Sequence, residues 1–159
     1  MAVNQRQNGR LTDEVLDDIN RGLLAELQRD ARLSLAELGR RIGLSPPAVG
    51  ERLARLEADG TIASYSANVD PRALGYSLSV VIRVRPAPRQ LHKVAQLAVD
   101  TPEVTECHRI TGEDCFFMKA HVRTVEHLEE VIDRFALFGQ TTTSVVQSSP
   151  VPVRGLAID

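Results

Sequence analysis

The stretch SLAELGRRIGLSPPAVGERLARLEADG, residues 34–60, decides the fold of the first half of the chain, because it predicts two helices joined by a very short turn. Ser34 followed three residues later by Glu37 has the pattern of a capping box, in which each side chain satisfies a free amide at a helix start. Gly43 supplies the left-handed residue that ends this helix. Ser45 then predicts a second N-cap, directly followed by a proline at the first helical position, where the missing amide removes no hydrogen bond.

The second helix of this stretch gathers Val49, Leu53 and Leu56 on one face, at about 100° per residue. A further amphipathic helix is predicted over residues 13–30, where leucine and isoleucine follow i, i+3 and i+4 spacing. Helix, short glycine-containing turn and helix is the helix-turn-helix arrangement, although ordinary three-helix bundles share this pattern. We expect the last helix to be the recognition helix, followed by a short two-stranded wing over TIASYSANV, residues 61–69.

The second half of the chain alternates between strand-like and helix-like hydrophobic patterns. The stretch DPRALGYS, residues 70–77, interrupts the pattern with a proline and a glycine, and a linker is expected over residues 66–76. Beyond it the elements are expected at 77–85 (strand), 89–100 (helix), 104–110 and 115–122 (strands joined by TGED), 124–138 (helix) and 141–149 (strand). This βαββαβ order predicts a ferredoxin-like sandwich, and the fold class is α+β. The expected parts are a flexible tail (1–12), a winged helix-turn-helix domain (13–65), the linker (66–76), a ferredoxin-like domain (77–150) and a C-terminal tail (151–159).

The composition narrows the classes of function. The chain has 159 residues, 43% of them hydrophobic, and no run approaches the roughly 18 uninterrupted apolar residues of a membrane span. The N-terminal stretch MAVNQRQNGR lacks the apolar core of an export signal, so a cytoplasmic protein is expected. Two cysteines without a CxxC pair and four scattered histidines predict no metal framework, and no cofactor is expected. The net charge is −2, yet residues 32–56 carry five arginines against two acids, which suits a surface that faces phosphates.

The predicted sheet has apolar side chains on both faces. Residues 80–82 are consecutive apolar residues of its first strand, and residues 116–118 are consecutive apolar residues of its third strand, so neighbours point to opposite faces. The helices of a βαββαβ unit cover one face only. The other face is therefore expected to bury against a partner, and a homodimer is the predicted assembly.

Several motifs resemble those of the Lrp/AsnC family of bacterial and archaeal feast/famine transcription regulators. They are LSPxxV at the start of the recognition helix, RLExxGxI at its end, DPxxLG in the linker, PEVxEC before the second strand and the TG of the turn. The resemblance covers about residues 15–150. It implies a winged helix-turn-helix that binds double-stranded DNA, and a ferredoxin-like domain that dimerises, often assembles dimers into octamers and commonly binds an amino acid at the dimer-dimer interface. A regulator and not an enzyme is expected.

The resemblance assigns the DNA contacts to the second and third helices. The implied contacts are the helix start, the nearby arginines and the outward face: Arg40, Arg41, Ser45, Pro46, Pro47, Ala48, Glu51, Arg52 and Arg55. A helix start attracts phosphate, and arginine contacts phosphate or the O6 and N7 atoms of guanine. Arg52 has the alternative of an ion pair with Glu37 or Glu57. Glu51 is either an acceptor for cytosine N4 or a surface acid, and Gly50 is expected to allow close packing of two helices rather than contact with DNA.

The effector site of the family uses the turn between the middle strands and residues of the last strand. Here these residues are Thr111, Gly112, Glu113, Asp114, Cys115, Thr141, Thr142, Thr143 and Ser144. Backbone amides and threonine hydroxyls suit a carboxylate, and Glu113 or Asp114 suits an ammonium group. Many relatives read G-D-Y-D where this sequence reads G-E-D-C, and in a strand a shift by one place turns a side chain to the other face. A plain β-turn with solvated acids is the alternative.

Two other functions are compatible with the residues. Haem-pathway decarboxylases resemble the same two-domain fold, and His108, Arg109 and His121 lie in the sheet region, where they would contact a tetrapyrrole carboxylate. A metal sensor would use Cys107, His108 and Cys115. The complete pattern of the recognition helix favours the DNA-binding regulator over the decarboxylase.

Overall fold

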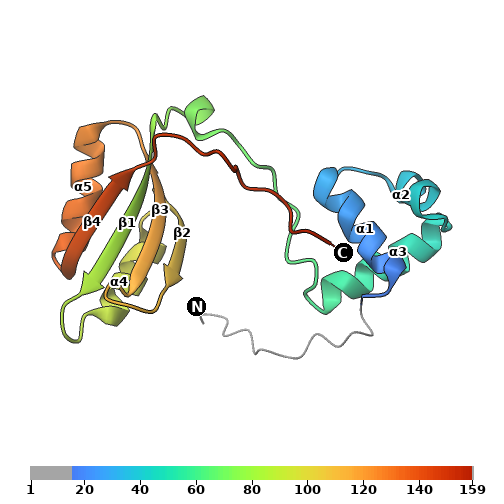
Figure 1. Ribbon diagram of the computed structural model, residues 1–159, viewed down its shortest axis with the longest axis horizontal. Coiled ribbons are helices and arrows are strands. Elements are labelled where there is room, and N and C mark those ends of the chain that lie inside the picture. Colours follow the sequence, from blue (N-terminus) through green and yellow to red (C-terminus); the bar gives the residue numbers. More distant parts are fainter. Residues whose placement is uncertain (1–15, 159) are drawn as a thin grey trace. The chain divides into compact units, whose positions relative to one another are not determined.

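The computed structural model describes residues 16–158 and divides them into two compact units, residues 16–67 with 153–158, and residues 68–152. The first unit is helical, and the second carries a four-stranded antiparallel sheet with two α-helices (Figure 1). The predicted α+β fold, a helix-turn-helix followed by a βαββαβ domain, is confirmed. The predicted N-terminal tail, and the first three residues of the first predicted helix, lie outside the described residues.

Three helices build the first unit: α1 (Asp18–Arg29), α2 (Leu35–Ile42) and α3 (Pro46–Ala58). The Asp17 side chain accepts from the Asn20 amide at 2.7 Å, which caps α1 at its first residue, Asp18. The three helices share one core, to which each contributes its inward face: Leu23, Leu38, Val49, Leu53 and Leu56. This core holds the short turn between α2 and α3 in place.

Three local predictions for the first unit need correction. Ser34 Oγ accepts from the Glu37 amide at 3.2 Å, but the Glu37 carboxylate bonds to two arginines of its own helix instead of closing the capping box. Ser45 is the N-cap residue of α3, yet its side chain makes no capping hydrogen bond. Residues 61–69 contain no strand, so the predicted wing is wrong. An isolated two-stranded hairpin is marginally stable, and this stretch also lacks a glycine or proline for a tight turn.

The second unit begins with a short 3₁₀ turn, η2 (Pro71–Leu74). The elements that follow are β1 (Leu78–Pro86), α4 (Leu91–Asp100), β2 (Val104–Arg109), β3 (Phe116–Val122), α5 (Val125–Ala136) and β4 (Gly139–Val145). The strands lie in the order β2-β3-β1-β4, as a ferredoxin-like sandwich requires. The last strand starts two residues before its predicted start, because Gly139 pairs with Pro86. No helix among residues 16–158 is both long and apolar enough to cross a membrane.

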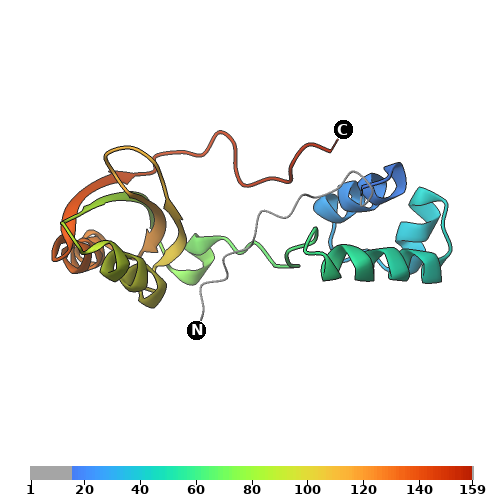
Figure 2. The ribbon, with the colours of Figure 1, turned by 90° about the horizontal axis from the view of Figure 1, so that it is seen from below.

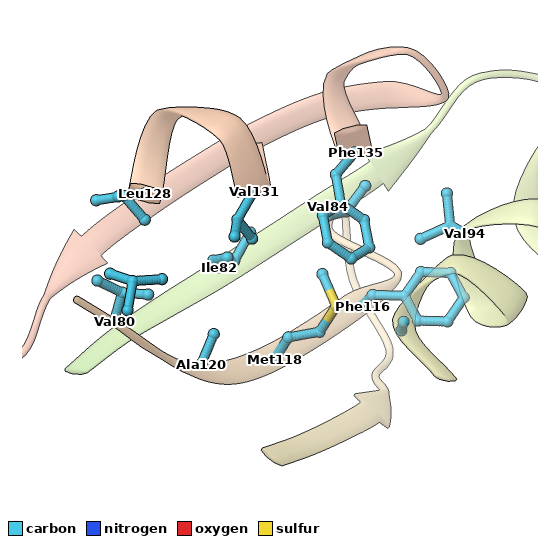
Figure 3. Close-up of a cluster of buried hydrophobic side chains, with 12 residues drawn as sticks. Val80, Ile82, Val84, Val94, Phe116, Met118, Ala120, Leu128, Val131 and Phe135 are labelled. Atoms are coloured by element: carbon cyan, nitrogen blue, oxygen red, sulfur yellow. The ribbon is translucent and has the colours of Figure 1, made fainter. Parts of the chain in front are cut away.

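Helices α4 and α5 lie on the same side of the sheet (Figure 2). Alternate residues of β1 and β3 point toward these helices, where Val80, Ile82 and Val84 approach the α5 side chains (Figure 3). The α5 side chains in this core are Leu128, Val131 and Phe135. Burial of this face fixes the strand register, because a slip by one residue would expose the whole set.

The other face of the sheet is mixed and not purely apolar. It carries Val81 and Phe117, both half-buried, as expected from the consecutive apolar residues. Arg83 and Lys119 pair with these two residues across the β1–β3 ladder, so each apolar side chain has a charged neighbour on the same face. The uncovered face of the sheet is therefore suited to polar as well as apolar contacts.

Candidate DNA-binding and effector sites

Two glycines hold the turn between α2 and α3. Gly43 ends α2 in the left-handed conformation with φ of 75°, and the Leu44 amide donates to the Gly39 carbonyl at 2.9 Å. A β-carbon at Gly39 would lie 2.4 Å from the Leu44 carbonyl oxygen, which is closer than non-bonded atoms approach. The turn therefore requires glycine at 39 as well as at 43, whereas the sequence pattern predicts only the role of Gly43.

The start of α3 presents a hydroxyl and one amide. Pro46 and Pro47 occupy the first helical positions and have no N–H, so Ala48 carries the first amide of the helix. The Ser45 carbonyl accepts from the Val49 amide at 3.1 Å, while the Ser45 side chain is exposed. The Ser45 hydroxyl and the Ala48 amide are the groups at this helix start that can donate to an anion.

Arg40 and Arg41 share one carboxylate. Arg40 bonds to both oxygens of Glu37, at 3.0 and 2.6 Å, and Arg41 bonds to Glu37 at 2.8 Å and to Glu26 of α1 at 2.6 Å. Hydrogen bonds from Arg40 and then Arg41 lower the pKa of Glu37 from 4.5 to about 2. The two predicted phosphate ligands are therefore oriented by acids of the same unit, and Arg40 Nη1 and Arg41 Nη2 have no hydrogen bond to those acids.

Arg52 ties α3 to the beginning of α1. Its Nη1 atom lies 2.6 Å from Asp17 Oδ2 and 3.0 Å from Asn20 Oδ1. The Asn20 amide and the Arg52 guanidinium lower the pKa of the Asp17 carboxyl. Arg52 therefore forms an ion pair within the unit, which was the alternative to a DNA contact. Its partner is Asp17 and not Glu57. The Glu57 carboxylate instead accepts from the Tyr65 hydroxyl at 2.8 Å. Arg52 fixes the position of α3 against α1.

Arg55 and Glu51 remain on the outward face of α3. Both are exposed, and neither side chain has a hydrogen bond or ion pair with another residue in the range 16–158. They line one shallow hollow of about 440 Å³ with Ala48 and the Asp17–Arg52 pair. Arg55 is thus a cation on the face of α3 that is available without breaking a contact. Gly50 lies beside this face, and a β-carbon there would meet Leu35 Cδ1 at 3.5 Å, an ordinary contact with α2.

In the second unit, two arginines of β1 reach the loop between β2 and β3. Arg85 pairs with Glu113, and Arg83 Nη1 lies 3.5 Å from Asp114 Oδ2. The loop is closed by the Ile110 amide, which donates to the Cys115 carbonyl at 3.0 Å. The acids that were expected to be free for an ammonium group are therefore already paired.

Arg83 and Arg85 are not among the effector-site residues predicted from the sequence. Their signal is present in SVVIRVR, where strand alternation places both arginines on one face. The sequence alone does not show whether this face of β1 is covered by the helices or open. The burial pattern in the folded chain shows that the arginines lie on the open face. The remaining loop residues are Thr111, which is exposed, and Gly112, whose φ is 108°.

The predicted residues of β4 divide between the two faces of the sheet. Thr142 stands opposite Arg83, and Ser144 stands opposite Val81, so both lie on the uncovered face. Thr141 and Thr143 lie on the helix-covered face, where the Thr143 hydroxyl is buried without a hydrogen-bond partner among the described residues. One ligand on the uncovered face can reach Thr142 and the Arg83–Asp114 pair, but not all four residues of β4.

Comparison with known families identifies both units. Residues 16–57 match the AsnC-type helix-turn-helix domain, and residues 79–156 match the Lrp/AsnC ligand binding domain. The transcriptional regulator LrpC of Bacillus subtilis is 35% identical over 133 residues, which is 84% of this chain and 92% of LrpC. The chain belongs to the Lrp/AsnC family. The resemblance to this family that the sequence motifs indicate is confirmed. LrpC is a transcription regulator.

Solved structures of the Lrp/AsnC family have the same fold. The structure of Bacillus subtilis LrpC has a TM-score of 0.81 at 34% identity, over 84% of this chain and 96% of LrpC. The feast or famine regulatory protein of Mycobacterium tuberculosis in complex with L-methionine has a TM-score of 0.84 at 32% identity, over 91% of this chain and 99% of that chain. A regulator of Neisseria meningitidis in complex with L-methionine has a TM-score of 0.80 at 26% identity, over 87% of this chain and 94% of that chain.

The histidines and cysteines of this Lrp/AsnC protein take part in separate contacts. His108 Nε2 lies 2.6 Å from Glu106 Oε1, and His121 Nδ1 lies 2.9 Å from Ser79 Oγ. Cys107 is exposed, and partial desolvation raises the pKa of its thiol. Within residues 16–158 no group of three histidine, cysteine or acidic side chains is arranged to hold a metal ion.

Proposed function

We propose that this Lrp/AsnC protein is a transcription regulator that binds double-stranded DNA through α3 and responds to a small molecule, an amino acid. The observation that carries the DNA-binding part is the outward face of α3, where Arg55 is exposed and has no ion-pair partner among the described residues. In this proposal residues 13–65 form the DNA-binding domain, residues 66–76 the linker and residues 77–150 the effector domain.

The residues of α2 and α3 have different roles in this proposal. Arg55 contacts DNA directly, and the Ser45 hydroxyl with the Ala48 amide binds a phosphate at the helix start. Arg40 and Arg41 reach phosphates through the N–H groups that Glu37 and Glu26 do not use, or by giving up those ion pairs. The outward face of α3 offers few hydrogen bonds to bases, since it presents mainly proline and alanine side chains. Recognition therefore depends on phosphate contacts and DNA shape more than on a dense set of base contacts.

The DNA-binding role is tested with the full chain and a duplex from the control region of its own gene. Arg55→Ala is expected to weaken binding by about tenfold or more, since removal of one arginine contact costs about 1–3 kcal/mol when the contact reads a base. Arg72→Ala is the matched control, because Arg72 is an exposed arginine of η2 in the second unit. Equal affinities for the wild type and Arg55→Ala, or equal losses in both variants, would exclude α3 as the DNA-reading helix.

Salt dependence separates the kinds of contact made by the arginines. Removal of one phosphate contact from the complex lowers the slope of log K against log salt by about one. We expect this change for Arg40→Ala, whose side chain is the more exposed of the two that bind Glu37. Arg52→Lys should instead lower affinity without changing the slope, because Arg52 positions α3 through Asp17 and need not touch a phosphate.

The effector part of the proposal rests on the Arg83–Asp114 pair. An α-amino acid carries a carboxylate and an ammonium group, and this pair offers one group of each opposite charge. Thr142 stands opposite Arg83 on the same uncovered face and supplies a hydroxyl. The ligand would open the 3.5 Å contact and take a place between the two side chains. The complexes of two relatives with L-methionine support this chemical class.

A thermal-shift series with the individual amino acids, L-methionine first, tests the effector site. A ligand at about 100 times its Kd stabilises the native state by about 2.7 kcal/mol, so a bound amino acid raises Tm. Asp114→Asn and Thr142→Val are expected to abolish the shift. Thr143→Val is the control, since Thr143 lies on the helix-covered face. A shift that survives Asp114→Asn, or is abolished in Thr143→Val alone, would place the ligand elsewhere.

Assembly and location complete the proposal. We propose a homodimer in which the uncovered face of the sheet, with Val81 and Phe117, contributes to the contact, and octamers built from such dimers. Light scattering coupled to sizing chromatography measures the assembly directly, with and without L-methionine. A regulator that binds DNA works where the chromosome lies, so we propose a cytoplasmic protein that acts by binding and not by catalysis. A change in the Soret band of added sirohaem or haem would count against a purely regulatory role.

A further inference from the structure

An apolar groove runs along α1 of the first unit, on a side not used by the DNA-binding residues. It has a volume of about 770 Å³. One wall is α1, with Leu24 and Leu27, and the other wall is the extended stretch 61–66. The C-terminal segment, defined as residues 153–158, enters this groove with its last three residues.

The C-terminal segment makes a close and specific contact with one turn of α1. Gln28 Nε2 donates to the Leu156 carbonyl at 3.2 Å, across 128 residues of sequence. A β-carbon at Gly155 would lie 2.2 Å from Gln28 Oε1 and 3.0 Å from Gln28 Cβ. The backbone at residue 155 therefore approaches α1 so closely that a side chain there would displace Gln28. A second, smaller hollow of about 280 Å³ lies along the same segment, next to Ala25 and Arg29.

The contact is made by the backbone more than by apolar side chains. Val153 is 80% exposed and Leu156 is 85% exposed, whereas Ile158 is half-buried. One hydrogen bond and one half-buried side chain contribute little against the entropy of ordering six residues. Such a contact forms and opens easily, while the fit of Gly155 against Gln28 makes it specific when formed.

The C-terminal segment is connected through the chain to β4 of the second unit. The strand β4, which presents Thr142 and Ser144, ends at Val145, and seven residues lead from there to the C-terminal segment. The linker before β1 is the first covalent connection between the two units, and this segment is a second. We infer that residues 153–158 are a strap that docks reversibly on α1 of the same chain and so ties the DNA-binding unit to the end of β4.

The strap contact is tested by a disulfide across it. Disulfides form where β-carbons lie about 3.5–4.5 Å apart, and the 3.0 Å between Gln28 Cβ and a β-carbon at Gly155 is within a small shift of this range. The full chain carries Gln28→Cys and Gly155→Cys, with Cys107 and Cys115 replaced by alanine, and is oxidised with diamide at low protein concentration. We expect a disulfide within one chain to form at least tenfold faster than in the control with Gln28→Cys and Val151→Cys.

Each result of this experiment decides for or against the strap. A disulfide between two chains would show that the segment docks on another copy and would overturn docking within the chain. Equal rates for the test pair and the control pair would overturn a specific contact. The measurement needs neither DNA nor an amino acid, so a chain that fails the tests of the proposed function can still pass this one.

Amide hydrogen exchange tests the same contact with the native cysteines in place. In Gly155→Val the new side chain collides with Gln28 and removes a contact of low stability, so exchange over α1 residues 24–29 and over 61–66 is expected to become faster by about twofold. Val151→Ala is the control, because Val151 is exposed and does not line the groove. Unchanged exchange in Gly155→Val, or an equal change over β1 and β3, would overturn the proposal.

Discussion

Replacement of Gly39 by alanine is expected to destabilise the first unit by opening its central turn. The new β-carbon would lie 2.4 Å from the Leu44 carbonyl oxygen, and backbone atoms on both sides leave no flexible group to move away. Overpacking costs about 1–3 kcal/mol, and a clash with backbone belongs near the upper end. Alanine favours a helix interior over glycine by about 1 kcal/mol, which offsets part of this cost. The net loss is roughly 2 kcal/mol, which lowers the Tm of a domain of this size by about 10 °C.

Gly50→Ala is the matched control in the same unit. A β-carbon at Gly50 would meet Leu35 Cδ1 at 3.5 Å, an ordinary contact, so this variant keeps the helix-propensity gain of about 1 kcal/mol and melts several degrees higher. Far-ultraviolet circular dichroism follows the melting, and amide exchange within α3 assigns the transition to the first unit. A Gly39→Ala chain that melts at the wild-type temperature, or above it, would refute the reasoning from the Leu44 carbonyl.

Three further outcomes are expected. The pKa of Glu37 is about 2 in the folded chain against 4.5 without partners, so its stabilising contribution is complete above pH 4.5 and is lost as the pH falls toward 2; melting curves should show a weaker pH dependence over this window for Glu37→Gln than for the wild type. Burial lowers the pKa of His121 below 6.5, so its neutral form stabilises the second unit above pH 6.5 and this contribution is lost at lower pH; His121→Asn should flatten the decline of amide protection in β3 below pH 6.5, and an unchanged slope would contradict this cause. Gly139→Ala should destabilise the second unit by about 2 kcal/mol, because its β-carbon would lie 2.3 Å from the Arg85 carbonyl oxygen; a urea midpoint equal to that of the wild type would count against this.

The sequence was sufficient to predict elements whose signals are local. The left-handed Gly43, the proline at the start of α3 and the changes of hydrophobic period each depend on neighbouring residues, and the structure has them as expected. The wing failed because alternation over residues 61–69 specifies an extended chain but no partner strand. The helix-breaking role of Gly43 was visible, whereas the need for Gly39 depends on where the Leu44 carbonyl comes to lie.

The candidate sites were predicted less completely, because they depend on contacts between distant residues. The ion pair of Arg52 joins residues 35 positions apart, and nothing near Arg52 in the sequence identifies Asp17 as its partner. Strand alternation alone separates Thr142 from Thr143, but the side that is open to a ligand follows only from the packing of α4 and α5. The same packing is needed to recognise Arg83 as a member of the candidate effector site.

Glu37 gives the proposed DNA-binding surface, at Arg40 and Arg41, a counterion of its own. An arginine that binds a phosphate releases a cation condensed on the DNA, with a gain in entropy. Arg40 and Arg41 hold a carboxylate that cannot diffuse away, so a random stretch of DNA gains less from approaching them. The ion pairs with Glu37 therefore lower the affinity of the protein for non-specific DNA. The contacts formed only at the correct site then account for a larger share of the binding free energy, and it is this share that separates one operator from the rest of a genome.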